Sequence, residues 1–126
     1  MEKEFREWYI EVLKKYTVFT GRARRKEYWM FTLFNIIISI AISIVAQLFV
    51  RIPVIGLIFG LLPLIYAIAV LLPSIAVGIR RLHDTNRSGW FLLLVLIPLV
   101  GAIVLIIFLV QEGTPGDNQY GANPKA

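Results

Sequence analysis

Three long stretches of the 126-residue chain contain no charged side chain: 30–50, 52–79 and 88–111. They are 21, 28 and 24 residues long. A membrane-spanning helix needs about 20 apolar residues to cross a hydrocarbon core of about 30 Å. The pattern therefore predicts a small polytopic membrane protein made mostly of its spans, with transmembrane helices at 30–50, 52–79 and 89–111.

The second stretch is too long for one perpendicular crossing and too short for two. As a helix it would extend about 42 Å, since each residue adds about 1.5 Å. We therefore expect one tilted or kinked span. Pro63 and Pro73 lie inside it, and each removes a backbone hydrogen-bond donor. Gly56 and Gly60 stand four residues apart, which lets a neighbouring helix approach closely.

The third stretch carries Pro98 and Gly101 near its middle. It can form either a simple span or a re-entrant hairpin. Because non-helical backbone at that depth has to be shielded by protein, we predict a simple span over 89–111. The tail that follows, 112–126, is rich in Gly, Pro and Asn. We expect this tail to form turns or a flexible end and not a helix.

The N-terminal part divides into an amphipathic helix, 4–16, and a basic loop, 17–29. Apolar and aromatic side chains recur at spacings of three and four along one helical face: Phe5, Trp8, Tyr9, Val12, Leu13 and Tyr16. Aromatic side chains opposite charged ones favour a helix lying in the head-group plane. Packing against another protein surface is the alternative. We therefore predict an all-α integral membrane protein with one domain, consisting of this interfacial helix and three transmembrane helices.

Composition restricts the kind of function. The chain contains no cysteine, which excludes disulfides, thiolate chemistry and cysteine-ligated metals. Its net charge of +5 would suggest nucleic acid in a soluble chain. Here the basic residues flank apolar stretches, so anionic lipid and topology are the simpler explanations. No spacing of catalytic residues is present, and we expect no enzyme activity, no cofactor and no nucleic-acid partner.

Lysine and arginine are concentrated on one side of the predicted spans. Eight precede the first span and three lie in the basic loop 80–88, whereas the first connection and the tail carry one each. The positive-inside rule therefore places the N-terminus and this loop in the cytoplasm. With three spans the tail lies outside, and a hairpin at the third stretch would return it to the cytoplasm.

The two basic segments meet on one membrane face in this topology. The candidate site residues are Arg22, Arg24, Arg25, Glu27, Arg80, Arg81, His83, Asp84 and Arg87. Arginine grips phosphate oxygens bidentately, so this cluster suits anionic lipid head groups or a partner protein. One alternative is a structural network in which Glu27 pairs with Arg80 or Arg81. Another is that these residues only set topology and extend to the surface.

His83 is the single histidine of the chain and precedes Asp84. A histidine beside a carboxylate can shuttle protons or sense pH. One His with one Asp supplies too few ligands for a metal site. We therefore expect structural hydrogen bonding at the membrane surface.

Three polar residues, Asn35, Ser39 and Ser43, stand four apart and share one face of the first span. Such a stripe either joins helices by hydrogen bonds or lines a polar path, and we expect helix packing. A small transporter or channel component that works as a homo-oligomer is the alternative function.

Three segments together resemble the domain-of-unknown-function 805 family of small YhaH-like bacterial inner-membrane proteins. They are GRARRKEYW at 21–29, RRLHD at 80–84 with SGW at 88–90, and GDNQYG at 116–121. The resemblance covers nearly the whole chain, in the family's order and spacing. It implies a multi-pass protein of the bacterial inner (plasma) membrane with about three spans, no cofactor and no assigned activity. From the residues we predict a non-enzymatic module that binds anionic lipid or a partner protein through the cytoplasmic-face Arg/His/Asp cluster.

Overall fold

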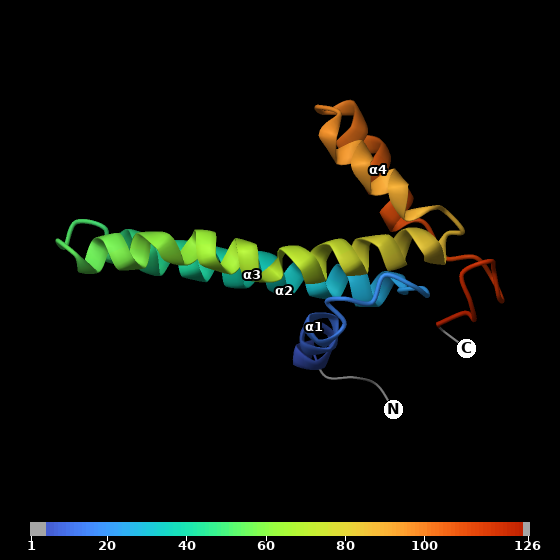
Figure 1. The fold of residues 1–126 in the computed structure, drawn as a ribbon, viewed down its shortest axis with the longest axis horizontal. Helices are drawn as coiled ribbons and strands as arrows, with labels where there is room; N and C mark the ends of the chain where they lie inside the picture. The colour runs from blue at the N-terminus through green and yellow to red at the C-terminus, as the bar shows by residue number, and fades with distance from the viewer. Residues whose placement is uncertain (1–4, 125–126) are drawn as a thin grey trace.

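The computed structural model describes residues 5–124, and these are organised entirely by helices and turns (Figure 1). The helical segments are α1 (Phe5–Lys14), α2 (Arg25–Phe49), α3 (Ile55–Asp84), the 3₁₀ helix η1 (Gly89–Leu96) and α4 (Val100–Val110). The predicted all-α class is confirmed for this part of the chain. Of the predicted boundaries, Glu4 in the first helix and Lys125 and Ala126 in the tail lie outside the described residues.

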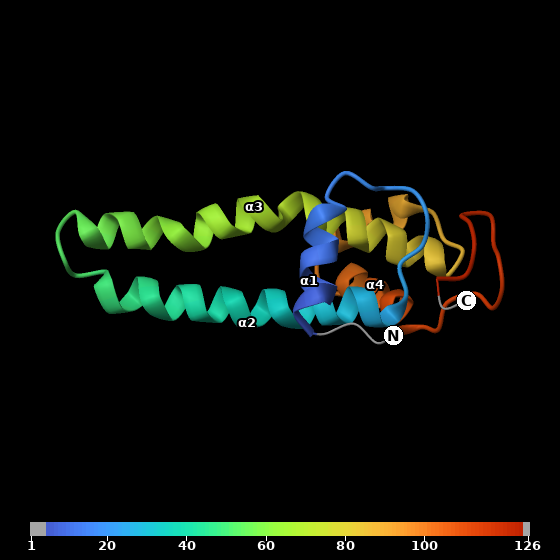
Figure 2. The ribbon, with the colours of Figure 1, turned by 90° about the horizontal axis from the view of Figure 1, so that it is seen from below.

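Helices α2 and α3 form a long antiparallel hairpin that sets the length of the molecule (Figures 1 and 2). Both are long and apolar enough to cross a membrane, and 11% of the apolar window of each is buried. The core helix of a soluble protein would be mostly buried. Most outward side chains of the hairpin are aliphatic, and Leu48 and Leu57 are each 73% exposed. The hairpin therefore presents a surface suited to lipid.

Both long helices extend into segments that the sequence assigned to basic loops. Helix α2 begins at Arg25, and α3 continues through Pro63 and Pro73 as far as Asp84. Charge does not end a helix, because lysine and arginine are good helix formers. The extension of α3 gives its charged last turn, 80–84, a fixed helical spacing.

The third apolar stretch differs from the single helix predicted over 89–111. Helices η1 and α4 pack against each other as a hairpin that reverses at Pro98 (Figure 1). Pro98 cannot donate a backbone hydrogen bond, and Leu99 has a φ of 61°, in the left-handed region. Gly101 permits the close approach, because a Cβ there would overlap the carbonyl oxygen of Leu94. The prediction of one continuous helix is wrong, and the structure has the hairpin alternative.

Helix α1 crosses the α2–α3 hairpin at a steep angle, in the half nearer the C-terminal end of α3 (Figure 2). Its Trp8 and Val12 are buried, and the Tyr9 ring stacks on Phe31 of α2 with 5.3 Å between ring centroids. Val12 also joins a core cluster with Val77 of α3. Much of the apolar face expected to enter the head-group plane therefore packs on the protein itself.

The tail folds back over the C-terminal end of α3, at the same end of the molecule as α1 (Figure 1). The backbone of Thr114 donates a hydrogen bond to Asp84 (2.8 Å), and Asn118 and Gly121 bond each other across a tight turn. The tail therefore lies against the basic segments, whereas three full spans would have put it on the other side of the membrane from them. Because η1 and α4 reverse the chain, α4 ends near the point where η1 begins.

Candidate functional site

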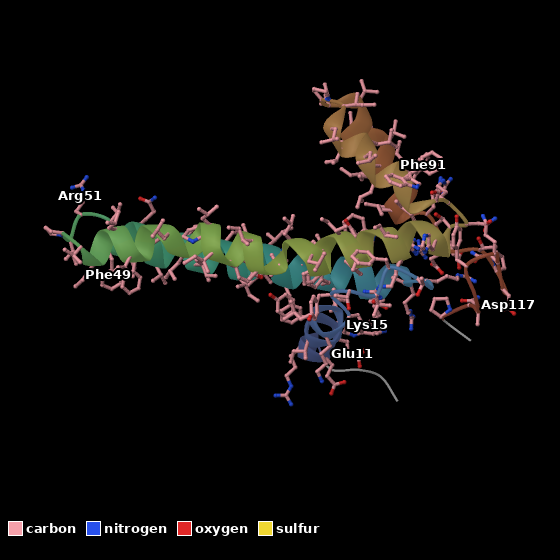
Figure 3. All side chains as sticks on the ribbon, in the orientation of Figure 1. Glu11, Lys15, Phe49, Arg51, Phe91 and Asp117 are labelled. Carbon is pink, nitrogen blue, oxygen red and sulfur yellow. The ribbon has the colours of Figure 1, made fainter. Side chains whose placement is uncertain are left out.

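Charged and polar side chains are buried together at this end of the molecule, hereafter the polar end. The buried charged cluster comprises Arg22, Arg80, Arg81, His83 and Asp84, each at most 8% exposed. Arg22 comes from the loop before α2, and the other four come from the last turn of α3. Figure 3 shows Asp117 of the tail at this end, and Phe49 and Arg51 at the opposite end of the hairpin.

Asp84 is the centre of the cluster. One carboxylate oxygen accepts from Arg22 Nε at 3.0 Å, and the other accepts from Arg81 Nη1 at 2.7 Å. The tail passes so close that a Cβ on Gly113 would overlap the carboxylate. A buried charge is tolerated only when it is paired with an opposite charge and hydrogen-bonded. Arg22 and Arg81 meet both requirements for this carboxylate.

Arg22 holds the tail in place through main-chain oxygens. Its Nη1 donates to the carbonyls of Gly116 (2.7 Å) and Gly121 (3.3 Å), and its Nη2 donates to those of Thr114 (2.7 Å) and Asp84 (3.3 Å). With the bond from Nε, five acceptors surround a group that has five N–H donors. Gly116 and Gly121 adopt φ values of +69° and +129°, which only glycine adopts readily. The turn that presents these carbonyls therefore depends on glycine.

Arg81 connects the cluster to the C-terminal end of α4. Its Nε donates to the carbonyl of Leu109 at 2.9 Å, and its Nη2 donates to the carbonyl of Gln111. Trp29 of α2 donates to the same Leu109 carbonyl at 3.2 Å. The last carbonyls of a helix lack intrahelical partners and carry partial negative charge, so a cation there is stabilising.

His83 joins three segments. Its Nδ1 lies 2.9 Å from the Gly21 carbonyl, and its ring stacks on Tyr120 of the tail with centroids 3.9 Å apart and planes 2° apart. Asn118 donates to the His83 carbonyl at 3.0 Å. Within residues 5–124 no group of three or more potential metal ligands comes together. The geometry gives His83 a packing role.

Arg80 forms an ion pair with Glu27 of α2. This is one of the two pairings that the structural-network alternative predicts. Ala23 also donates its N–H to the Arg80 carbonyl at 2.9 Å. Two other nitrogens of this guanidinium, Nε and Nη2, are buried and have no hydrogen-bond partner among the described residues. Arg24 Nε is in the same condition.

The other predicted cations lie around the buried charged cluster. Arg24 is half-buried 5.8 Å from the Trp8 ring, and Arg87 sits 4.1 Å over the Phe108 ring. Arg25 is exposed and donates to the Val110 carbonyl. The predicted site residues therefore divide into an inner group that is buried among other parts of the protein and an outer group of three arginines, Arg24, Arg25 and Arg87.

Sequence reasoning missed the acceptors in the tail. The carbonyls of Thr114, Gly116 and Gly121 hold Arg22, and Tyr120 covers His83. The GDNQYG segment contributes to the family resemblance, but its residues alone assign it no role. A main-chain acceptor has no side-chain pattern, and the glycines that need positive φ were the only available signal.

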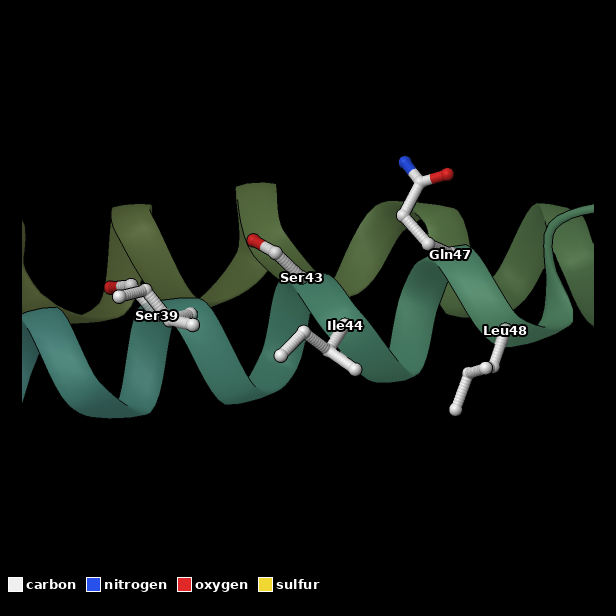
Figure 4. Close-up of a pocket in the computed structure, with 6 residues that line it drawn as sticks. Ser39, Ser43, Ile44, Gln47 and Leu48 are labelled. Carbon is white, nitrogen blue, oxygen red and sulfur yellow. The ribbon is translucent and has the colours of Figure 1, made fainter.

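A second polar feature lies between the apolar helices. Tyr9 and Tyr66 hydroxyls are 2.7 Å apart, and Tyr66 donates to Asn35 Oδ1 at 2.7 Å. They adjoin a groove of about 270 Å³ between α2 and α3. Its polar lining is Asn35, Ser39, Ser43, Tyr66 and Ser74. In Figure 4, Ser39, Ser43 and Gln47 project from one side of α2, away from Ile44 and Leu48, so the expected stripe continues to Gln47.

The family model described as "Protein of unknown function (DUF805)" matches residues 16–122. The chain is 50% identical over 119 residues to "Inner membrane protein YhaI" of Escherichia coli (strain K12), covering 94% of this chain and 96% of that protein. It is also 50% identical over 119 residues to "Inner membrane protein YhaH" of the same strain, covering 94% and 97%. No solved structure matches the chain. The family match spans the whole buried charged cluster and most of the tail.

Proposed function

Because the chain belongs to the DUF805 family, whose relatives above are inner membrane proteins, we propose that it is a non-enzymatic module of the bacterial inner membrane. Its activity is to bind anionic lipid head groups at the polar end. The observation that carries this proposal is the outer group of arginines, Arg24, Arg25 and Arg87, arranged around a cluster that is already rich in cations.

The proposed orientation follows from charge and the α4 hairpin. The positive-inside rule puts the polar end in the cytoplasm, with α2 and α3 crossing the membrane. Helix η1 is about 16 Å long and α4 about 17 Å, roughly half of a 30 Å hydrocarbon core. We propose that they enter the bilayer from the cytoplasmic side and return. Both chain ends then lie in the cytoplasm.

Three members of the inner group support the binding surface but do not form it. Arg22, Arg81 and Asp84 are buried and use their donors and acceptors on each other and on backbone carbonyls. An anionic head group would have to displace those partners. Arg25 makes one exposed hydrogen bond, and Arg87 contacts the face of an aromatic ring. Neither would have to give up buried partners in order to bind a head group.

Reporter fusions at the C-terminus test the orientation. We expect a cytoplasm-only reporter fused after Ala126 to be active and an outside-only reporter to be silent. The opposite result would mean that 89–111 crosses the membrane completely, and it would separate the tail from the basic loops.

Lipid preference tests the binding. The double variant Arg25→Gln/Arg87→Gln should lose about thirtyfold of the preference for phosphatidylglycerol over phosphatidylcholine in mixed-lipid nanodiscs, because each cation near an anionic surface contributes about 1 kcal/mol. Arg51→Gln, an exposed arginine at the opposite end, is the matched control. An unchanged preference in the double variant would sink the lipid proposal and favour a protein partner.

The polar groove between α2 and α3 favours a second candidate, an oligomeric transporter or channel component. Ser43 and Gln47 are exposed on a face that is otherwise apolar. Polar side chains on such a face pair with another helix in lipid. A strictly monomeric protein in native-like lipid would count against this candidate.

A further inference from the structure

Arg80 differs from the other arginines of the buried charged cluster because part of its guanidinium has no acceptor. The side chain is 2% exposed, and its Nη1 donates to Glu27. Its Nε and Nη2 are buried without a partner among the described residues. Arg22, by contrast, has an acceptor for each of its five donors. A buried charged donor without a partner is costly, so the unpaired edge needs an acceptor.

A second unpaired donor lies in the adjoining segment. Arg24 Nε is buried without a partner, and Arg24 follows Ala23, whose N–H bonds the Arg80 carbonyl at 2.9 Å. Trp8 of α1 lies 5.8 Å from the Arg24 guanidinium carbon and 5.4 Å from Lys26 Nζ. Unused donors therefore occur on two arginines in adjoining segments, where the loop before α2 is bonded to α3.

We propose that Arg80 and Arg24 form a binding site for one phosphate group, supplied by an anionic phospholipid. Nε and Nη2 form one edge of the guanidinium fork, and two phosphate oxygens match that edge. The proposal rests on the proposed function, because the same class of head group is bound. The two proposals differ in the number of lipids bound: this site takes a single phosphate group, whereas Arg25 and Arg87 act on the surrounding lipid.

The surroundings favour a lipid over a free anion. Val77, one helical turn before Arg80, packs with Val12 of α1 and with Phe31 of α2. The site thus lies where the apolar length of the hairpin ends and the polar end begins. Trp8 is amphipathic, as residues at the head-group level commonly are.

Helix α1 lies beside the site, since its Trp8 ring is 5.8 Å from the Arg24 guanidinium carbon. The unpaired nitrogens are buried with α1 in place. Helix α1 ends at Lys14 and α2 begins at Arg25, so ten residues connect them. Because these nitrogens are buried, entry of a phosphate requires the segments that cover them to move, and the ten-residue connection leaves α1 free to do so.

The test measures the first lipid bound by the full chain. Purified protein in detergent is titrated with dioctanoyl phosphatidylglycerol, and native mass spectrometry gives the Kd of the first lipid. We expect Arg80→Lys, which keeps the charge beside Glu27 and loses the fork, to raise that Kd about tenfold. Arg24→Lys should act in the same direction. Arg51→Lys, with the same chemistry at the opposite end, should leave the Kd unchanged.

The outcomes separate the site from the proposed function. Equal Kd values in the wild type, Arg80→Lys and Arg24→Lys would overturn the site, whatever the lipid preference of the outer cations. If Arg80→Lys does not fold, Arg24→Lys decides alone. An Arg25→Gln/Arg87→Gln protein that keeps the first Kd and loses its general preference for phosphatidylglycerol supports both proposals. Displacement of the lipid by 10 mM inorganic phosphate would assign the site to free phosphate and overturn the lipid source.

Discussion

The two ends of the α2–α3 hairpin are held together by different means. At the polar end, arginine side chains bridge α3 to the tail, to α4 and to α2. At the opposite end the two helices meet through a short connection and the stacked rings of Phe49 and Phe59, whose centroids are 4.6 Å apart. In lipid, apolar surface gains little by packing against other apolar surface. The hydrogen bonds and ion pairs of buried polar groups therefore fix the positions of the segments more than apolar packing does.

Asp84→Asn should break this asymmetry most strongly. The change removes the charge that two buried arginines share, and breaking a buried pair in this way costs about 3–5 kcal/mol. We expect a large fall in the thermal midpoint in detergent. Asp117→Asn, an exposed position in the tail, is the control and should leave the midpoint close to that of the wild type.

Equal midpoints for Asp84→Asn and Asp117→Asn would contradict a cluster that stabilises the fold. The same comparison in lipid nanodiscs shows whether the effect depends on the detergent.

Gly113→Ala should have an intermediate effect. The added Cβ would overlap the Asp84 carboxylate, so the tail has to shift away from α3 at a cost of about 1–3 kcal/mol. Denaturant unfolding followed by tryptophan fluorescence measures this cost. Gly60→Ala adds the same methyl group to open space on α3, where alanine favours the helix. A destabilised Gly60→Ala would contradict the difference in packing between the polar end, which has no room for the added methyl group, and the opposite end, which has room for it.

Tyr120→Leu should have the smallest effect of the three. It replaces a ring stacked on His83 with an aliphatic group, and an aromatic contact of this kind contributes about 0.5–1.5 kcal/mol beyond buried area. We expect faster proteolysis of the tail with an unchanged midpoint for the helices. A tail that is cut at the wild-type rate would mean that its hydrogen bonds hold it without the ring contact.

Several features of the polar end could be predicted from the sequence. The pairing of Glu27 with Arg80 was one of the pairs considered, because opposite charges stood in two segments that the topology brought together. Arg81 and Asp84 stand three residues apart, a spacing that lets two side chains meet on one helical face. These pairs are visible in sequence because both partners are charged side chains.

The reversal at Pro98 could not be decided in the same way. A proline inside an apolar stretch is compatible with a continuous helix, and α3 continues through Pro63 and Pro73. The third stretch differs because Gly101 accepts the close approach of Leu94 and Arg81 holds the returning end at Leu109. Both are contacts between segments, so the local pattern of residues carries no sign of them.

By itself, the sequence determined that the chain is built from apolar helices with its cations gathered at one end. Those properties depend on composition and on local spacing, which need no knowledge of neighbours. Only the tertiary structure decided that the tail lies on the basic segments, that Arg22 and Arg81 are used internally, and that Arg80 keeps an unpaired edge. The physical reason is that each of these depends on which acceptor reaches which donor, and most of those acceptors are carbonyls distant in the chain.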